Sequence, residues 1–140
     1  MKVFISHAHS DEHLAQKVAA ILQEAGLEVW DAMREILPGD NWAQEVSNAL
    51  QESEAMVILL TPDAVRSEWV RREMRWNIEY ALGEVRFRSR LIPVVAGDPD
   101  ILNTEGVPWI LRHQKMVDLT QHENEEEGIR EVARTLLQVA

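Results

Sequence analysis

The sequence predicts an α/β fold in which five parallel strands form one sheet with helices on both faces. Short apolar runs that resemble strands alternate with segments of helical apolar spacing throughout the 140 residues. The run Glu54–Thr61 is almost continuously apolar, as expected for a central parallel strand covered on both faces. Right-handed crossovers and short connections then favour a flavodoxin-like three-layer sandwich of strand order 2-1-3-4-5. The length fits a single domain over residues 1–140.

The first half of the predicted fold contains two strands, each followed by a helix or a loop. Lys2–Ser6 and Leu27–Asp31 are short apolar runs bounded by polar residues, which is typical of strands. Between them, Asp11–Ala25 carries apolar residues at helical spacing, and the glycine after it favours a helix end. Arg34–Asn41 contains a Pro-Gly pair and is predicted to be a loop. Trp42–Gln51 has one apolar face, and the asparagine before it can cap its first turn.

The second half follows the central strand. A helix is predicted over about Glu68–Leu82, because a serine that can cap it precedes this segment and a glycine follows it. Leu91–Ala96 is a fourth apolar strand, and Lys115–Leu119 is a fifth, shorter one. The segment Ile101–Arg112 between them is expected to be irregular or weakly helical. Asn124–Glu127 has the composition of a capping box and is expected to start the last helix.

Composition excludes several classes of function. The formal net charge is −10, with 24 acidic and 14 basic residues, which opposes binding to nucleic acid because that affinity comes largely from phosphate neutralisation. The absence of cysteine excludes disulfides, thiolate chemistry and cysteine-ligated zinc. No apolar run approaches the roughly 20 residues that span a bilayer. We therefore expect a cytoplasmic domain that binds neither nucleic acid nor membrane.

The most informative segment follows the central strand and reads Ser67-Glu68-Trp69-Val70-Arg71-Arg72-Glu73. Residues four apart lie on one face of a helix, so Trp69 and Glu73 can line the same wall. The loops Ser6–Ser10 and Thr61–Ser67 should flank one crevice at the carboxyl ends of neighbouring strands, where open α/β sheets bind ligands. Spacing alone still favours a surface glutamate that pairs with the arginines beside it, next to a tryptophan that belongs to the core.

Several segments, taken in order, resemble the Toll/interleukin-1 receptor (TIR) domain family along nearly the whole chain, and in particular its bacterial NAD-cleaving branch. They are Phe4-Ile5-Ser6-His7, Val29-Trp30-Asp31 with Pro38-Gly39, Asn41-Trp42, and Ser67-x-Trp69-x-x-x-Glu73. His7 stands where the family usually has tyrosine, and Val70 stands where many members have cysteine. Pro108-Trp109 resembles the third conserved motif of the family only weakly. None of these departures excludes the activity of the family.

The resemblance implies an NAD+ nucleosidase that breaks the nicotinamide–ribose bond and releases nicotinamide with ADP-ribose or a cyclic ADP-ribose. It implies that Glu73 is catalytic and that NAD+ is the substrate, with no separate cofactor and no metal. It also implies homotypic assembly through the Arg34–Trp42 loop, which would activate the domain in bacterial immunity signalling. The residues that it implies for substrate binding are Ser6, His7, Asp31, Arg34, Trp42, Ser67 and Trp69.

Two other interpretations stay open. The domain can be a non-catalytic TIR interaction module that acts by homotypic association. The run His7-Ala8-His9-Ser10-Asp11-Glu12-His13 also nearly matches the metal-binding H-x-H-x-D-H pattern of metallo-β-lactamase-like hydrolases, which suggests a zinc hydrolase that uses His7, His9 and Asp11. Glu12 is an extra residue in that pattern. The simpler interpretation is that Asp11 caps the first helix beside surface histidines, where helix-start amides could also meet a phosphate.

Overall fold

The computed structural model describes residues 1–68, 74–75 and 90–139, and over these residues it contains one five-stranded, all-parallel sheet. Its order is β2-β1-β3-β4-β5, which confirms the predicted flavodoxin-like topology. The strands are β1 (Lys2–Ser6), β2 (Glu28–Asp31), β3 (Ala55–Leu60), β4 (Leu91–Val95) and β5 (Val117–Asp118). The central strand β3 is buried along its whole length, as its continuous apolar run requires.

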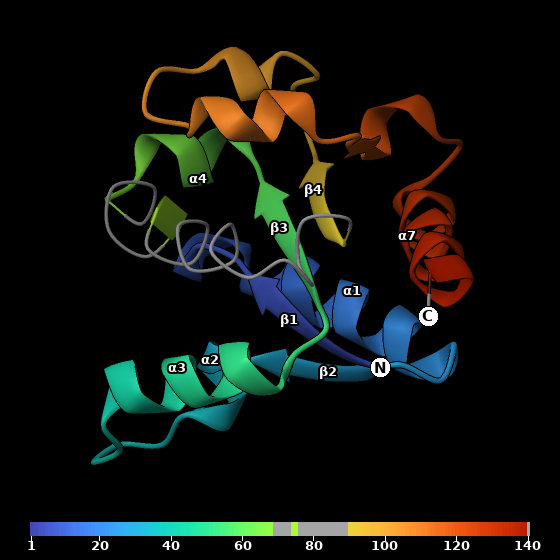
Figure 1. Cartoon of the computed structure of the whole chain (residues 1–140). Coiled ribbons are helices and arrows are strands. Elements are labelled where there is room, and N and C mark those ends of the chain that lie inside the picture. Colours follow the sequence, from blue (N-terminus) through green and yellow to red (C-terminus); the bar gives the residue numbers. More distant parts are fainter. Residues whose placement is uncertain (69–73, 76–89, 140) are drawn as a thin grey trace.

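Helices cover both faces of the sheet (Figure 1). Among the described residues, the α-helices are α1 (Glu12–Glu24), α2 (Ala32–Glu35), α3 (Trp42–Glu52), α4 (Pro62–Arg66) and α7 (Glu125–Val139). The 3-10 turns are η1 (His9–Asp11), η3 (Ile101–Asn103), η4 (Trp109–His113) and η5 (Leu119–Gln121). Successive side chains of a strand point to opposite faces, so β1, β3 and β4 each contribute to two cores. Helices α1 and α7 complete one core, and α3 and α4 contribute to the other.

Several predicted boundaries are wrong. The loop predicted over Arg34–Asn41 starts inside α2, because Ala32–Glu35 consists of residues that form a helical turn readily. The loop predicted over Thr61–Ser67 contains α4, which Thr61 caps by accepting a hydrogen bond from the Ala64 amide. The fifth strand is shorter than predicted. The helix expected over about Glu68–Leu82 lies almost entirely outside the described residues.

The last helix begins as its sequence predicts. The Asn124 side chain accepts a hydrogen bond from the Glu127 amide over 2.9 Å, which is the first half of a capping box. Lys17 of α1 bridges to Glu125 and Glu126 at the start of α7, over 3.0 and 3.1 Å. These contacts tie the two helices of one face together at their polar edge.

Met1 and the end of α7 lie at the amino end of the sheet, opposite the carboxyl ends of the strands (Figure 1). This follows from the topology, because β1 starts at that edge and α7 runs back toward it from the carboxyl end of β5. Within the described ranges, no helix is long and apolar enough to cross a membrane.

Candidate functional site

The carboxyl ends of β1, β2 and β3 bring four polar side chains to one edge of the sheet. Ser6 and His7 end and follow β1, Asp31 ends β2, and Thr61 follows β3. The register places Asp31 beside Ile5 on β1 and places Ser6 beside Ile58 on β3. Parallel strands end at the same edge, so residues more than 20 positions apart in sequence become neighbours here.

His7 and Asp31 form a buried hydrogen-bonded pair at this edge. The His7 Nε2 atom lies 2.8 Å from Oδ1 of Asp31, and its Nδ1 atom lies 2.8 Å from the Ala8 carbonyl oxygen. A carbonyl oxygen and a carboxylate oxygen are both acceptors, so this geometry suits a His7 ring that is protonated on both nitrogens. Both side chains are 1 % exposed.

The surroundings of His7 stabilise its charged form. Burial lowers the pKa of His7, but the hydrogen bond and charge of Asp31, the Ala8 carbonyl and the charge of Asp11 outweigh burial and raise it above 6.5. Both ring nitrogens of His7 face acceptors within the protein, which leaves neither of them to donate to a ligand. Ser6, His7 and Asp31 are all buried, and their expected contact with a substrate stays a prediction.

A second polar contact joins the exits of β1 and β3. The Thr61 hydroxyl lies 3.0 and 2.8 Å from the two carboxylate oxygens of Asp11. Asp11 sits at the N-cap position of α1, yet its side chain makes no capping hydrogen bond there. Sequence reasoning missed the contact with Thr61, although Thr61-Pro62 is a cap followed by a helix-starting proline and signals α4.

The amides at the start of α1 are partly engaged within η1. The Asp11 amide donates to the Ala8 carbonyl over 3.0 Å, and the Glu12 amide donates to the His9 carbonyl. The Asp11 carboxylate lies beside them. The expectation that these amides meet a phosphate therefore has less support from the structure than it has from the sequence.

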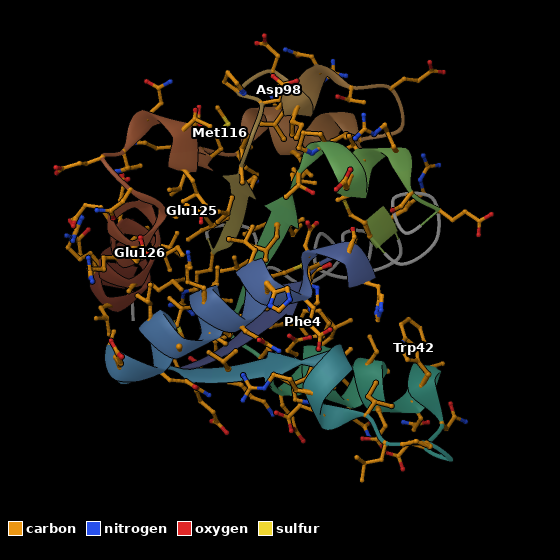
Figure 2. The ribbon with its side chains drawn as sticks, turned by 180° about the vertical axis from the view of Figure 1, so that it is seen from behind. Phe4, Trp42, Asp98, Met116, Glu125 and Glu126 are labelled. Carbon is orange, nitrogen blue, oxygen red and sulfur yellow. The ribbon has the colours of Figure 1, made fainter. Side chains whose placement is uncertain are left out.

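The remaining described candidates lie around this edge at the surface. Trp42 begins α3, which Asn41 caps, and is 39 % exposed. Figure 2 shows Trp42 on the side of the molecule away from Glu125 and Glu126. Arg34 is exposed on α2. The Ser67 hydroxyl donates to the Ala64 carbonyl over 2.7 Å and thus closes the C-terminus of α4.

Two predicted site residues, Trp69 and Glu73, lie outside the described residues. Met74, which follows Glu73 in the sequence, is described and is fully buried. It belongs to the core cluster that includes Ala64 of α4 and Leu91 of β4. The catalytic assignment of Glu73 and the substrate-binding assignment of Trp69 stay predictions.

The histidine run does not gather as a metal site in the described part of the chain. No three histidine, aspartate or glutamate side chains there could hold a metal ion together. His7 is buried and paired with Asp31, which corrects the expectation of surface histidines at that position, whereas His9 and His13 are exposed. The ring nitrogens of His7 are both occupied, and this speaks against the zinc-hydrolase interpretation.

Three curated relatives share 29–33 % identity with parts of the chain. The NAD(+) hydrolase PdTIR of Paracoccus denitrificans is 29 % identical over 66 % of this chain and 30 % of its own length. The NAD(+) hydrolase TcpA of a Theionarchaea archaeon is 33 % identical over 68 % of this chain and 28 % of its own. The 2′ cyclic ADP-D-ribose synthase AbTIR of Acinetobacter baumannii is 30 % identical over 51 % and 27 %, respectively. The chain spans less than a third of each relative.

Solved structures support the fold. The TIR domain of the Toll-related receptor TRR-2 from Hydra magnipapillata superposes with a TM-score of 0.69 at 21 % identity, covering 97 % of this chain and 94 % of that one. The TIR domains of the activated Roq1 resistosome superpose with a TM-score of 0.74 at 17 % identity, covering 96 % and 98 %. At these identities the match concerns the fold alone.

The family itself follows from the sequence comparison. The family model described as TIR domain matches residues 3–133, which include all five strands except the first residue of β1, and most of α7. The match agrees with the strand order and with the segments at the exits of β1, β2 and β3. The chain belongs to the TIR domain family.

Proposed function

We propose that this TIR domain cleaves NAD+ at the bond between nicotinamide and ribose. The observation that carries the proposal is the similarity to three relatives that are each named for NAD+ hydrolysis or cyclic ADP-ribose synthesis. The sequence Ser67–Glu73 supports it, because it continues from β3 and α4, which leave the sheet at the edge where α/β sheets bind ligands.

The chemistry requires only one carboxylate. The bond between the pyridinium nitrogen of NAD+ and ribose C1′ breaks, its electron pair stays on nitrogen, and nicotinamide leaves as a neutral molecule that needs no proton. Positive charge develops on the ribose as an oxocarbenium-like species. Glu73 accepts hydrogen bonds from the ribose hydroxyls and stabilises that charge more than it stabilises the ground state, which lowers the barrier. Water then adds to C1′ and loses a proton, giving ADP-ribose.

Residues around the sheet edge have supporting roles in this proposal. Trp42 is partly exposed and, with Trp69, offers apolar surface to a planar ring. Arg34 is exposed and adds a positive charge near a site on an otherwise acidic chain, which suits the pyrophosphate. The His7–Asp31 pair holds the ends of β1 and β2 in fixed register beneath them. If an adenine nitrogen or a ribose hydroxyl reaches C1′ before water, the product is a cyclic ADP-ribose.

We further propose that the domain acts in the cytoplasm, where NAD+ is abundant, and that assembly of several copies activates it in an immune response. The Arg34–Trp42 loop supports assembly, because Leu37 is 65 % exposed at its tip and Trp42 is exposed at its end. The same exposed loop also favours a second candidate function, a TIR module that associates with its own kind without catalysis.

One experiment separates these functions. The purified protein at high concentration is incubated with NAD+, beside Glu73→Ala, Glu73→Gln and the neighbouring control Glu68→Ala, and nicotinamide is quantified by chromatography. We expect both Glu73 variants to lose at least about 100-fold in rate while Glu68→Ala keeps its activity. Circular dichroism establishes that each variant is folded.

Two outcomes would contradict the proposal. Full turnover by a folded Glu73→Ala protein would remove the proposed mechanism. An assembled wild-type protein that releases no nicotinamide would favour the non-catalytic module. The assay therefore includes light scattering on the same samples, so that inactivity of an unassembled protein is not mistaken for absence of catalysis.

A further inference from the structure

We propose that Asp11 is a positioning residue for NAD+ cleavage, which acts by fixing α4 through the hydroxyl of Thr61. This inference rests on the proposed function, because α4 directly precedes the segment of the sequence that holds the proposed catalytic residue Glu73. The Asp11 carboxylate and the Thr61 hydroxyl are the contact between η1, at the exit of β1, and α4, at the exit of β3. We call this contact the Asp11–Thr61 link.

The Asp11–Thr61 link sets the orientation of the cap of α4. The Thr61 hydroxyl donates a hydrogen bond to Asp11, and its oxygen lone pairs then accept one from the Ala64 amide, with an N···O distance of 3.1 Å. Without the carboxylate, the hydroxyl is free to rotate and to donate elsewhere. The direction of this capping hydrogen bond therefore depends on a residue 50 positions earlier in the chain.

Helix α4 needs such support because it is only five residues long. A helix of this length is not stable by itself and depends on its contacts. Ala64 anchors it from below in the core. Gly97, after β4, supports it from the side, since a Cβ at that glycine would lie 3.1 Å from the Pro62 ring. The Asp11–Thr61 link adds a contact from η1, the 3-10 turn that follows β1.

The side chain of Asp11 is engaged with Thr61 and not with the helix that it precedes. Burial raises the pKa of Asp11, and Asp63 of α4 adds to this, while the Thr61 hydroxyl and the charge of His7 counteract it. A carboxylate at the N-cap position of a helix usually accepts from the amides of that helix. Asp11 makes no such bond to α1 and turns instead to Thr61.

The consequence reaches the proposed site along the chain. Helix α4 ends at Arg66, and the Ser67 hydroxyl after it closes the last turn by donating to the Ala64 carbonyl. From Ser67 the sequence continues into the segment that holds Trp69 and Glu73. Displacing a catalytic group by about 1 Å costs up to about 100-fold in rate, so a short helix that starts this segment has to be held firmly.

The test compares variants that break the link with variants that keep it. Asp11→Ala and Thr61→Val break it, whereas Asp11→Asn and Thr61→Ser retain an acceptor and a donor. Asp63→Ala, which removes an exposed acidic residue from the same helix, is the matched control. The kcat and KM for NAD+ cleavage and the unfolding temperature are measured for each full-length variant.

We expect kcat to fall at least about tenfold in Asp11→Ala and in Thr61→Val, with KM changed less than about threefold. Asp11→Asn, Thr61→Ser and Asp63→Ala should stay within about threefold of wild type. The double variant Asp11→Ala/Thr61→Val should lose no more than Thr61→Val alone, because Thr61→Val already removes the link together with the cap on the Ala64 amide. If one single variant does not fold, the other breaks the same link.

Three results would overturn the inference while NAD+ cleavage by the wild type stands. They are an unchanged kcat in a folded Asp11→Ala, equal losses in Asp11→Ala and Asp11→Asn, and multiplying losses in the double variant. If the wild type releases no nicotinamide, the proposed function fails and hydrogen exchange decides the structural part. Faster exchange of the Ala64 amide in Asp11→Ala, but not in Asp11→Asn, supports the link, and unchanged exchange overturns it.

Discussion

His7 donates a hydrogen bond from Nε2 to Oδ1 of Asp31 over 2.8 Å, and this pair joins the ends of the neighbouring strands β1 and β2. The two residues are 24 positions apart and meet because Ile5 and Asp31 are register partners. Both side chains are buried, so we expect the pair to affect the stability of the fold.

The stability of the domain should fall as the pH rises above about 6.5, the ordinary pKa of histidine. Asp31, the Ala8 carbonyl and Asp11 raise the pKa of His7 in the folded state despite its burial, so the folded state holds the proton more tightly than the unfolded state does. The stabilisation is complete below the unfolded pKa and is lost as the pH passes the folded pKa.

Urea unfolding of wild type, His7→Gln and His9→Gln between pH 5.5 and 8.5 measures this effect. The decrease with pH should disappear in His7→Gln and persist in His9→Gln, which removes an exposed histidine two positions away. A wild-type stability that increases over this range would contradict the assignment of His7 as the charged partner. The same would follow from an identical slope in His7→Gln.

Gly128→Ala should destabilise the domain by about 1–2 kcal/mol, although alanine is the better helix former. A Cβ at this position of α7 would lie 2.5 Å from Cδ2 of Leu119 and 3.1 Å from Cδ2 of His122. Leu119 is buried, so it has little room to move away. Denaturant midpoints with equal m-values measure the change.

The exposed residue Gln138 of α7 offers a control, and Gln138→Ala should stay within about 0.5 kcal/mol of wild type. Gly128→Ala with unchanged or higher stability would mean that α7 can shift away from η5 at no cost.

Leu37→Glu should weaken self-association without lowering the unfolding temperature of the monomer. Leu37 is 65 % exposed in the proposed assembly loop, so its side chain contributes little to the stability of the monomer. An apolar contact between copies through this loop would be weakened by a charged side chain at the same position. Sedimentation velocity over a range of concentrations measures the association.

Leu137→Glu is the matched control for this prediction, since Leu137 is another exposed leucine, at 49 %, on α7. Equal association of wild type and Leu37→Glu would argue against the loop as the assembly surface. Loss of association only in Leu137→Glu would move that surface to α7.

Sequence patterns predicted the parts of this fold that depend on long apolar runs. The run at β3 is buried on both faces, and this alone marks a central strand of a parallel sheet. The short helix α4 was missed because five residues are too few to show a helical period. The sequence does contain a local indication of this helix, the capping residue Thr61 followed by Pro62, but the segment Thr61–Ser67 was predicted to be a loop.

The polar contacts of the site were harder to predict. Sequence reasoning placed His7 and Asp31 at strand ends, but their pairing depends on the register between β1 and β2, which no local pattern reveals. Asp11 was expected to cap α1, as its position suggests. Instead, its carboxylate accepts a hydrogen bond from Thr61, which follows β3. This contact joins residues that are distant in the sequence, so no local pattern reveals it.

The placement of Met1 and the end of α7 at the amino end of the sheet has a practical consequence for experiments on surfaces. A tag at either end would tether the domain by the edge opposite His7, Asp31 and Thr61. Copies immobilised in this way would all turn the candidate site toward the bulk solution, whichever end carries the tag. A dense lattice on a bead or a vesicle could then raise the local concentration of domains while leaving that edge open to small solutes.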